Sequence, residues 1–165
     1  MSSLKGRMLL FLSLFAIWLL LTYPITVPEA VAGAITALII TAISGKEAAL
    51  FREIHISIRS AAYGIAYLFV FFFELVKSNI DVAFRVLHPK LPIHPGIVKV
   101  KTKLKSRLGR MILANSITLT PGTITVETEE NYFYIHWVDV RTPDIEESTK
   151  KIVLKFEKYL EVICG

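Results

Sequence analysis

One predicted helix carries four ionisable side chains just after its sequence changes from apolar to charged. At helical spacing these side chains project within an arc of about 80°. Ionisable groups inside a membrane are costly, which makes them candidates for an ion path. Here they follow the apolar run AAYGIAYLFVFFF, Ala61 to Phe73, so a position at the membrane interface is favoured. The candidate interfacial residues are Glu74, Lys77, Asp81 and Arg85.

Alternate positions between residues 97 and 105 carry lysine, which predicts a strand with one basic face. Near anionic lipid headgroups each lysine contributes about 1 kcal/mol, so a membrane surface or an acidic partner is favoured. We predict no nucleic-acid binding, because neither interleaved aromatic residues nor a recognition helix accompanies this face. A charged solvent edge that prevents strand pairing is the alternative. The candidate contact residues are Lys99, Lys101, Lys103, Lys105, Arg107 and Arg110.

The residues that could perform catalysis do not form a recognisable constellation. Cys164 stands next to the last residue, and His136 beside Trp137 is interpreted as a packed or interface histidine rather than a general base. Ser116 and Asp139 have no evident partner in the sequence. The two histidines of the proline-rich linker lack a third ligand nearby, and there is no phosphate-binding glycine loop. We therefore predict no catalytic residue, no metal and no cofactor.

Charge and polarity divide the chain into two halves. Residues 8–43 contain one charged residue, Glu29, whereas residues 97–165 are ordinary in charge. The apolar half is predicted to lie in lipid; two buried helices of a soluble bundle are the alternative, which the length and the lack of charge disfavour. The net charge of +5 suits an anionic partner such as lipid headgroups.

The apolar half is predicted to form a helical hairpin followed by one long helix. Two apolar runs are separated by a proline-containing connection, and the small residues of the second run suit close helix contact in lipid. The long helix continues as an amphipathic extension, supported by the i,i+4 pairs Lys77–Asp81 and Asp81–Arg85. The predicted transmembrane region is 1–88, with spans at about 8–23, 28–44 and 58–76 and an amphipathic extension to 88.

Prolines mark a linker at 89–96, and residues 97–165 are predicted to form a small soluble α+β domain of order β-α-β-β-α. The predicted elements are strand 97–105, helix 106–115, strands 123–128 and 132–140, and a final helix from Pro143-Asp144 to about Ile163. A domain of this size is marginally stable alone. Docking on the membrane or on neighbouring subunits is expected to support it.

Residues 115–123, NSITLTPGT, place Asn, Ser and threonines around Pro-Gly, which predicts a turn held by side-chain-to-backbone hydrogen bonds. Together with Tyr134 to Trp137, this segment resembles the E subunit of the Mrp-type multisubunit cation/proton antiporters. Glu74 to Asn79 and Arg85 to Pro89 extend the resemblance, as does Pro95-Gly96 before the lysines, so that it covers nearly the whole chain. The motif residues are Asn115, Ser116, Thr118, Thr120, Pro121, Gly122, Thr123 and His136.

The resemblance implies a role that the residues alone do not give. Complexes of this family exchange cytoplasmic Na⁺ for external H⁺, and related modules occur in archaeal membrane-bound hydrogenases and sulfane reductases. Their large subunits carry a buried lysine–glutamate relay, which this sequence lacks. The resemblance therefore implies a non-catalytic accessory or assembly subunit whose partners are other membrane subunits. A self-contained, membrane-anchored lipid- or protein-binding module is the alternative.

Basic residues near the spans predict the orientation in the membrane. Lys5 and Arg7 favour an internal N-terminus, whereas nine basic residues between Lys77 and Arg110 favour an internal C-terminal domain. The larger cluster decides the prediction. We expect a multi-pass protein of the cell membrane with a cytoplasmic C-terminal domain and, if all three helices span, an external N-terminus.

Overall fold

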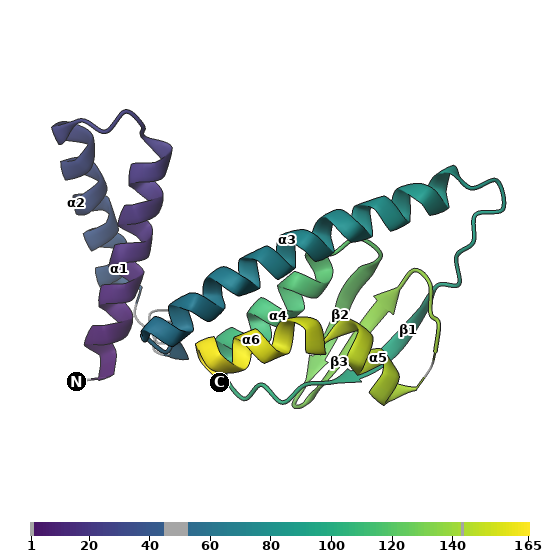
Figure 1. The fold of residues 1–165 in the computed structure, drawn as a ribbon. Helices are drawn as coiled ribbons and strands as arrows, with labels where there is room; N and C mark the ends of the chain where they lie inside the picture. Colours follow the sequence, from purple (N-terminus) through teal and green to yellow (C-terminus); the bar gives the residue numbers. More distant parts are fainter. Residues whose placement is uncertain (1, 45–52, 143) are drawn as a thin grey trace. The chain divides into compact units, whose positions relative to one another are not determined.

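The computed structural model describes residues 2–44, 53–142 and 144–165. It divides the chain into two compact units, Met1–Ile54 and His55–Gly165 (Figure 1). The first unit contains helices α1 (Ser2–Leu21) and α2 (Val27–Ile43). The second contains α3 (Ile58–Leu87), β1 (Gly96–Lys101), α4 (Arg107–Leu119), β2 (Thr123–Glu129), β3 (Tyr132–Trp137), α5 (Ile145–Ile152) and α6 (Leu154–Cys164). Apolar N-terminal helices followed by an α+β region confirm the predicted fold class.

The α1–α2 hairpin is built on small residues. Thr26 and Glu29 form a capping box that begins α2, and the Thr26 backbone N–H donates to the Glu29 carboxylate at 2.9 Å. The buried face of α2 contains Gly33, Ala37 and Thr41, spaced four residues apart. The small residues that were predicted to suit close helix contact therefore serve the contact within the hairpin.

Helix α3 begins at a cap and ends before a proline. The Ser57 hydroxyl accepts a hydrogen bond from the Ser60 N–H at 3.0 Å, and Pro89 cannot continue the helix beyond Leu87. By length and composition, α1 and α3 are apolar enough to cross a membrane, because they contain 18-residue stretches with mean hydropathies of 1.9 and 1.4. Helix α2 is a shorter apolar helix. Mean hydropathy does not register how apolar residues are distributed around a helix.

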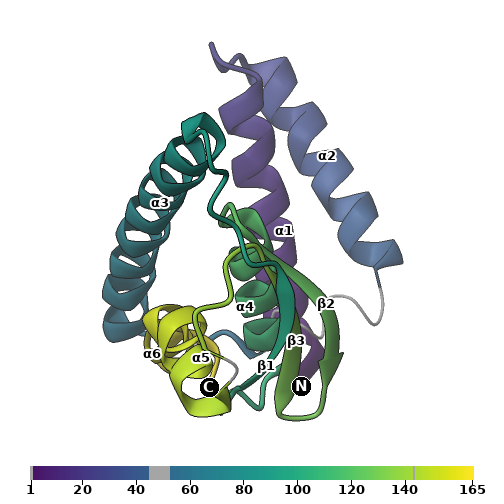
Figure 2. The same cartoon turned by 90° about the vertical axis from the view of Figure 1, so that its right-hand side faces the viewer.

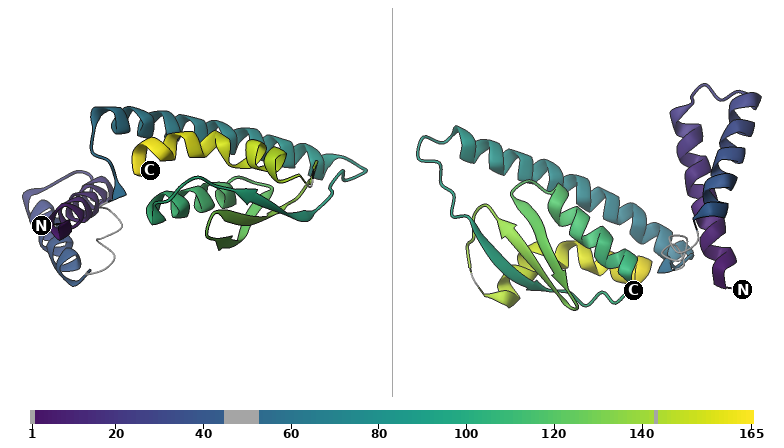
Figure 3. Two further views of the ribbon diagram at one scale, coloured as in Figure 1. Left: turned by 90° about the horizontal axis from the view of Figure 1, so that it is seen from below. Right: turned by 180° about the vertical axis from the view of Figure 1, so that it is seen from behind.

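The three strands form an antiparallel sheet in the order β1-β3-β2. Val98, Val100, Phe133 and Ile135 point to one face of the sheet and are buried there, as period-two alternation predicts. Helices α4 and α6 lie between this face and α3 (Figure 3). The buried core contains Val98, Val100, Leu104, Leu113, Ile117, Phe133, Ile135, Ile152, Val153, Phe156 and Leu160.

Strand β1 ends at Lys101, earlier than the predicted limit at residue 105. The buried Glu157 of α6 accounts for this ending, because its carboxylate accepts the Thr102 hydroxyl at 2.5 Å and the Lys103 backbone N–H at 2.7 Å. The chain turns at these bonds, so that Lys99 and Lys101 lie on the strand and the last two lysines do not. The prediction of a single strand face with four lysines is therefore wrong.

Two helices of the α+β region also differ from the prediction. Helix α4 continues to Leu119, so the first half of the NSITLTPGT segment is helical rather than part of a turn. The predicted final helix is interrupted at Val153 between α5 and α6. Helix α5 contacts β1, where the Lys101 N–H donates to the Thr149 hydroxyl at 2.9 Å, whereas α6 contacts α3. Because the chain changes direction at Val153, the C-terminal segment contacts both β1 and α3. Pro143 lies outside the described residues.

Gly33→Val is expected to separate the two helices of the hairpin, because a Cβ at Gly33 would overlap the Trp18 indole. Overpacking of this kind costs about 1–3 kcal/mol. The measurement is SDS-induced unfolding of the full chain in mixed micelles, followed by Trp18 fluorescence in a Trp137→Phe background. Ala32→Val, at an exposed neighbouring position, is the matched control, and an equal loss in both variants would contradict the prediction.

Candidate functional site

The inner face of α3 contacts the rest of its unit at several points along the helix, and this set of contacts is here named the α3 seam. Figure 2 shows α3 on one side of α4 and the sheet on the other. Its positions on α3 are separated by three, four, seven or eight residues and so share one side of the helix. The facing elements are α6, the end of α4 and the chain around the end of β3. On α3 the seam consists of Ser60, Tyr67, Phe71, Glu74, Val82 and Arg85.

The N-terminal half of the α3 seam is aromatic. The rings of Tyr67 and Phe71 both pack against Phe156, with centroid distances of 6.3 and 6.4 Å. At the edge of the seam, the ring centroids of Tyr63 and Tyr159 lie 6.1 Å apart. Phe156 is fully buried, so these rings extend the core of the α+β domain onto α3. Part of the apolar run that was predicted to face lipid is therefore used for contact with α6.

The middle of the α3 seam is an ion pair between distant parts of the sequence. The Glu74 carboxylate accepts a hydrogen bond from the Lys155 ammonium of α6 at 2.7 Å. Lys77 makes a looser pair with Glu74 at 3.8 Å, rather than the predicted pair with Asp81. The predicted Asp81–Arg85 pair is present at 2.7 Å. The ionisable face of α3 thus turns in part toward the α+β domain.

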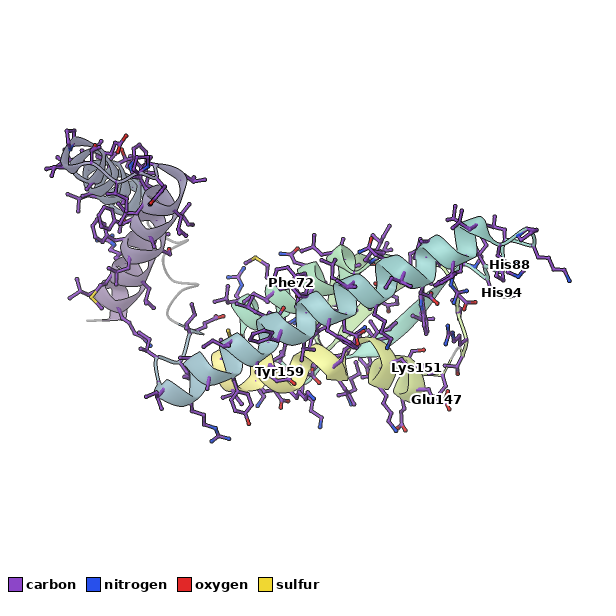
Figure 4. The ribbon with its side chains drawn as sticks, turned by 45° about the horizontal axis from the view of Figure 1, so that its top comes forward. Phe72, His88, His94, Glu147, Lys151 and Tyr159 are labelled. Carbon is purple, nitrogen blue, oxygen red and sulfur yellow. The ribbon has the colours of Figure 1, made fainter. Side chains whose placement is uncertain are left out.

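Two arginines and a histidine contact the carboxylate of Asp139, just after the end of β3. Its carboxylate lies 2.9 Å from Arg85 Nη1, 3.2 Å from Arg141 Nε and 3.1 Å from His94 Nδ1. The side chains of Arg85 and Asp139 are only 13% and 14% exposed, a setting in which charge-assisted hydrogen bonds are strong. Figure 4 shows His94 and His88 near the C-terminal end of α3.

The same neighbours set the pKa of Asp139. Burial raises it, but the hydrogen bonds from His94 and Arg141 and the positive charges of Arg85 and Arg141 outweigh burial, so the pKa lies below its usual value. The charged carboxylate therefore stabilises the fold at every pH above the unfolded pKa. This contribution is lost as the pH falls through the lower, folded pKa.

The NSITLTPGT segment forms the part of the seam opposite the middle of α3. The Ser116 hydroxyl donates to the Ile112 carbonyl at 2.8 Å and is hydrogen-bonded to the Tyr67 hydroxyl of α3. Gly122 has a φ of +90°, and a Cβ there would lie 3.0 Å from Val138 and 3.7 Å from Val82 of α3. Ser116 and Gly122 therefore bring α4, the turn and α3 together.

Threonine hydroxyls of the same segment form hydrogen bonds with the nearby backbone. The Thr120 hydroxyl donates to the Ser116 carbonyl at 2.7 Å, and the Thr123 hydroxyl donates to the Ile117 carbonyl at 2.7 Å. The Thr118 hydroxyl accepts the Thr125 N–H at 3.1 Å. These bonds confirm the predicted side-chain-to-backbone hydrogen bonds, although residues 115–119 are helical rather than part of the turn. Pro121 lies beside them, on the wall of a cavity under α3.

That cavity has a volume of about 450 Å³ and lies between the C-terminal half of α3 and the end of the sheet. Charged side chains line it alongside apolar ones such as Val82 and Trp137. Its anionic groups Glu74, Asp81 and Asp139 are each paired with a lysine or an arginine. Among the residues that the structure describes, no three His, Cys, Asp or Glu side chains are grouped to hold a metal ion. The carboxylates of the cavity are thus all paired, and basic side chains outnumber them in its lining.

The predicted basic contact residues separate into different places. Lys99 lies on the open face of the sheet, with its ammonium 4.2 Å from the centroid of the Tyr132 ring. Lys105, Arg107 and Arg110 line a second cavity of about 430 Å³ together with the motif residue Asn115. Lys101 and Lys103 are exposed. The fold therefore separates the four lysines that were predicted to share one strand face.

The open face of the sheet carries an apolar row around the motif histidine. His136 pairs across the sheet with Ile97 on one side and Ile124 on the other. Both isoleucines are exposed and His136 is half-buried. This row lies on the side of the sheet away from α4 and α6, and it offers an apolar surface on a water-facing domain.

Several residues of the α3 seam were not found from the sequence. Ser116 and Asp139 were assigned no partner, and Tyr67 and Lys155 were not considered. Tyr67 and Ser116 are separated by 49 residues, and Glu74 and Lys155 by 81. The one local signal was that Glu74 and Arg85 share a helical face, which indicates a common surface but not what covers it.

The fold and the seam define a membrane protein with an apolar helical hairpin and an α+β domain docked on a long amphipathic helix. The chain belongs to the Na⁺/H⁺ ion antiporter subunit family, which matches residues 11–163. This finding confirms the resemblance predicted from NSITLTPGT and its companion segments.

Individual relatives are similar over parts or all of the chain. The Na⁺/H⁺ antiporter E subunit of Alkalihalophilus pseudofirmus is 45% identical over 91 residues, which cover 54% of this chain and 56% of that protein. The corresponding antiporter protein of Bacillus subtilis is 37% identical over 97 residues, covering 58% and 60%. The chain thus spans little more than half the length of these curated relatives.

One solved structure is similar over almost the whole chain. It is a chain in the structure of the membrane-bound sulfane sulfur reductase, an archaeal respiratory membrane complex. The two are 40% identical with a TM-score of 0.82, and the match covers 96% of this chain and 98% of the other.

Asp139→Asn is expected to speed amide hydrogen exchange in the last turns of α3 roughly tenfold at neutral pH. In this variant two arginines lose a charged hydrogen-bond acceptor, which is expected to destabilise the docked end of α3 by about 1–2 kcal/mol. The wild-type protein should also lose protection below about pH 4, as Asp139 becomes protonated, and the variant should lose less.

Asp81→Asn is the matched control, because Asp81 pairs with the same Arg85 but is 53% exposed. Asp81→Asn is expected to change the stability of the docked end of α3 by no more than about 0.5 kcal/mol. Equal exchange rates in the two variants, or an unchanged acid response in Asp139→Asn, would contradict the assignment.

Tyr67→Phe and Ser116→Ala are each expected to lower the free energy of unfolding by about 1 kcal/mol, and the double variant by less than the sum. The reason is that both remove the same hydrogen bond. Urea unfolding of the full chain in detergent, followed by Trp137 fluorescence in a Trp18→Phe background, measures this. Tyr63→Phe, on the same helix, is the control, and strictly additive losses would rule the coupling out.

Proposed function

We propose that this chain is a non-catalytic accessory subunit that supports the assembly of a multisubunit cation/proton antiporter, or of the antiporter module of a membrane-bound respiratory complex of hydrogenase type. In this role it supports Na⁺/H⁺ exchange without carrying the ions. Its proposed partners are other membrane subunits and anionic lipid headgroups.

The observation that carries the proposal is the family match over residues 11–163. The whole-chain similarity to a subunit of an archaeal respiratory membrane complex supports the respiratory host as well as the free antiporter. Both hosts are membrane complexes of several subunits, so a small subunit of this type needs surfaces for its neighbours.

Ionisable residues of α2 and α3 already have hydrogen-bond or ion-pair partners within the chain, which supports a non-catalytic role. Glu29 is the one charged residue between positions 8 and 43, and its carboxylate accepts the Thr26 N–H and hydroxyl, both at 2.9 Å. Glu74 and Arg85 are held in the α3 seam by Lys155 and Asp139. A proton or cation relay needs groups that can change partner and charge, and these are fixed as structural contacts.

Two surfaces are suited to neighbouring subunits. The outer side of the α1–α2 hairpin exposes large apolar side chains, among them Leu12, Ile35 and Leu38. The Ile97–His136–Ile124 row offers an apolar patch on the α+β domain. An apolar centre with a polar surround is typical of protein interfaces.

We place the α+β domain on the cytoplasmic side of the cell membrane. The basic residues that follow α3 support this placement, because cytoplasmic segments near spans are enriched in lysine and arginine. They include the exposed Lys90, Lys101, Lys103 and Lys105.

Deleting the chain from its host is expected to reduce the amount of intact complex on native gels and to abolish Na⁺-dependent proton transport in membrane vesicles, both restored by a plasmid copy. A tag on the chain should co-purify the large antiporter-type subunits, and iron–sulfur or nickel-bearing partners would identify the respiratory host. Ion transport by the purified chain alone in liposomes would contradict the accessory role.

A further inference from the structure

Helix α3 is docked on the α+β domain over nearly its whole length. The Ser60 hydroxyl donates to the Val162 carbonyl at 3.2 Å near one end, and Arg85 pairs with Asp139 at 2.9 Å near the other. At 1.5 Å per residue, these contacts span about 38 Å of helix. The hydrocarbon core of a bilayer is about 30 Å thick. A docked α3 that crossed the membrane would therefore carry the domain into lipid.

The α+β domain is unsuited to lipid. Its three-stranded sheet has two edge strands, β1 and β2, whose outward backbone groups need water or another strand. Exposed charges such as Lys101, Glu129 and Lys158 surround it, and each is costly in hydrocarbon. The seam and the sheet together argue against α3 as a span.

The outer face of α3 is apolar from end to end. Positions within about 60° of the side opposite the seam, counted at 100° per residue, hold no polar side chain. Ile58, Phe69 and Leu87 on this strip are 93%, 73% and 80% exposed. Figure 4 shows Phe72 on the side of α3 away from Tyr159. The strip consists of Ile58, Ala62, Ile65, Ala66, Phe69, Phe72, Phe73, Val76, Ile80, Ala83, Phe84 and Leu87.

Basic side chains flank this strip. Arg59 and Lys77 project about 80° from its centre, on the same flank as Asp81, and both are exposed. A helix with a continuous apolar face rich in Phe and with basic residues beside it has the pattern of helices that lie in the membrane interface. Cations at this position reach anionic headgroups while the strip enters the acyl region.

The distribution of basic residues supports two spans rather than three. No lysine or arginine occurs between Arg7 and Lys46. With two spans, the N-terminal Lys5 and Arg7, the segment after α2 and the α+β domain all lie on one side, and the connection between α1 and α2 lies on the other. With three spans, the basic residues divide between both sides, contrary to the usual bias.

We infer that α3 lies in the plane of the membrane surface, with its apolar strip in the acyl chains and the α+β domain on its water side. The chain then crosses the bilayer twice, through α1 and α2, and the span predicted at 58–76 is an interfacial helix instead. Lipid is the proposed occupant of the strip because a membrane surface accounts for the strip, its basic flank and the charge distribution together. A protein neighbour would account for the strip alone.

The first test measures sidedness with the full chain in native membranes. Single cysteines are introduced as Ser2→Cys and Lys103→Cys in a Cys164→Ala background and labelled with an impermeant maleimide. Both are expected to react from the same, cytoplasmic side, seen as labelling in inverted vesicles and protection in right-side-out vesicles. Reaction from opposite sides would overturn the inference.

The second test measures depth along the strip. Spin labels at Ala62→Cys, Phe69→Cys, Val76→Cys and Ala83→Cys sit seven residues apart on one face. The tagged complex is placed in vesicles of phosphatidylethanolamine and phosphatidylglycerol, and oxygen and nickel-chelate accessibilities are compared. All four labels are expected at the same shallow depth, about 5–10 Å below the headgroups. The control Lys77→Cys should report the headgroup layer.

Each alternative has its own signature. A spanning helix would place the two end labels about 10 Å shallower than the two central ones. A strip covered by a protein neighbour would exclude both oxygen and the nickel chelate at all four positions. Either result would overturn the inference, and the sidedness test remains decisive where a strip variant does not fold.

Discussion

Helix α3 has to satisfy two different surroundings along the same 30 residues, and the rest of the structure is arranged around that constraint. Its inner face carries Tyr67, Phe71, Glu74 and Arg85, which continue the core and the ion pairs of the α+β domain. Its outer face carries apolar side chains that water does not favour. A small three-stranded sheet with few helices is marginal in size, so the area that α3 contributes to its core is part of what makes the domain stable.

The NSITLTPGT segment acquires a physical role from this arrangement. Ser116 ties the segment to Tyr67, and Gly122 adopts a backbone conformation that a side chain would disfavour while lying close to Val82. Threonine hydroxyls satisfy the carbonyls at the end of α4 without help from water. The motif segment therefore lies where the α+β domain contacts its long helix, and its contacts help to hold the domain against α3.

The same arrangement also fixes the ionisable side chains of the α3 seam. Charges that resemble an intramembrane relay in the sequence are neutralised within the molecule, Glu74 by Lys155 and Asp139 by Arg85 and Arg141. What remains free is surface: the apolar outer sides of the hairpin and of α3, and the isoleucine row around His136. A subunit with fixed charges and apolar outer surfaces is built to be surrounded by other molecules, whether membrane proteins or lipid.

The spacing of apolar residues and the local composition determined which segments are helices or strands, the hairpin and the α+β order, because these depend on neighbouring residues. Motifs that are contiguous in the chain determined the family. They also placed Glu74 and Arg85 on one helical face. The tertiary structure alone decided what covers that face. Lys155 and Asp139 are remote from α3 in sequence, and no local pattern encodes such a partner. The same holds for the end of β1, which the distant Glu157 sets by binding Thr102 and Lys103. Composition also identified the apolar run of α3, whereas only the packing shows which side of that run contacts α6.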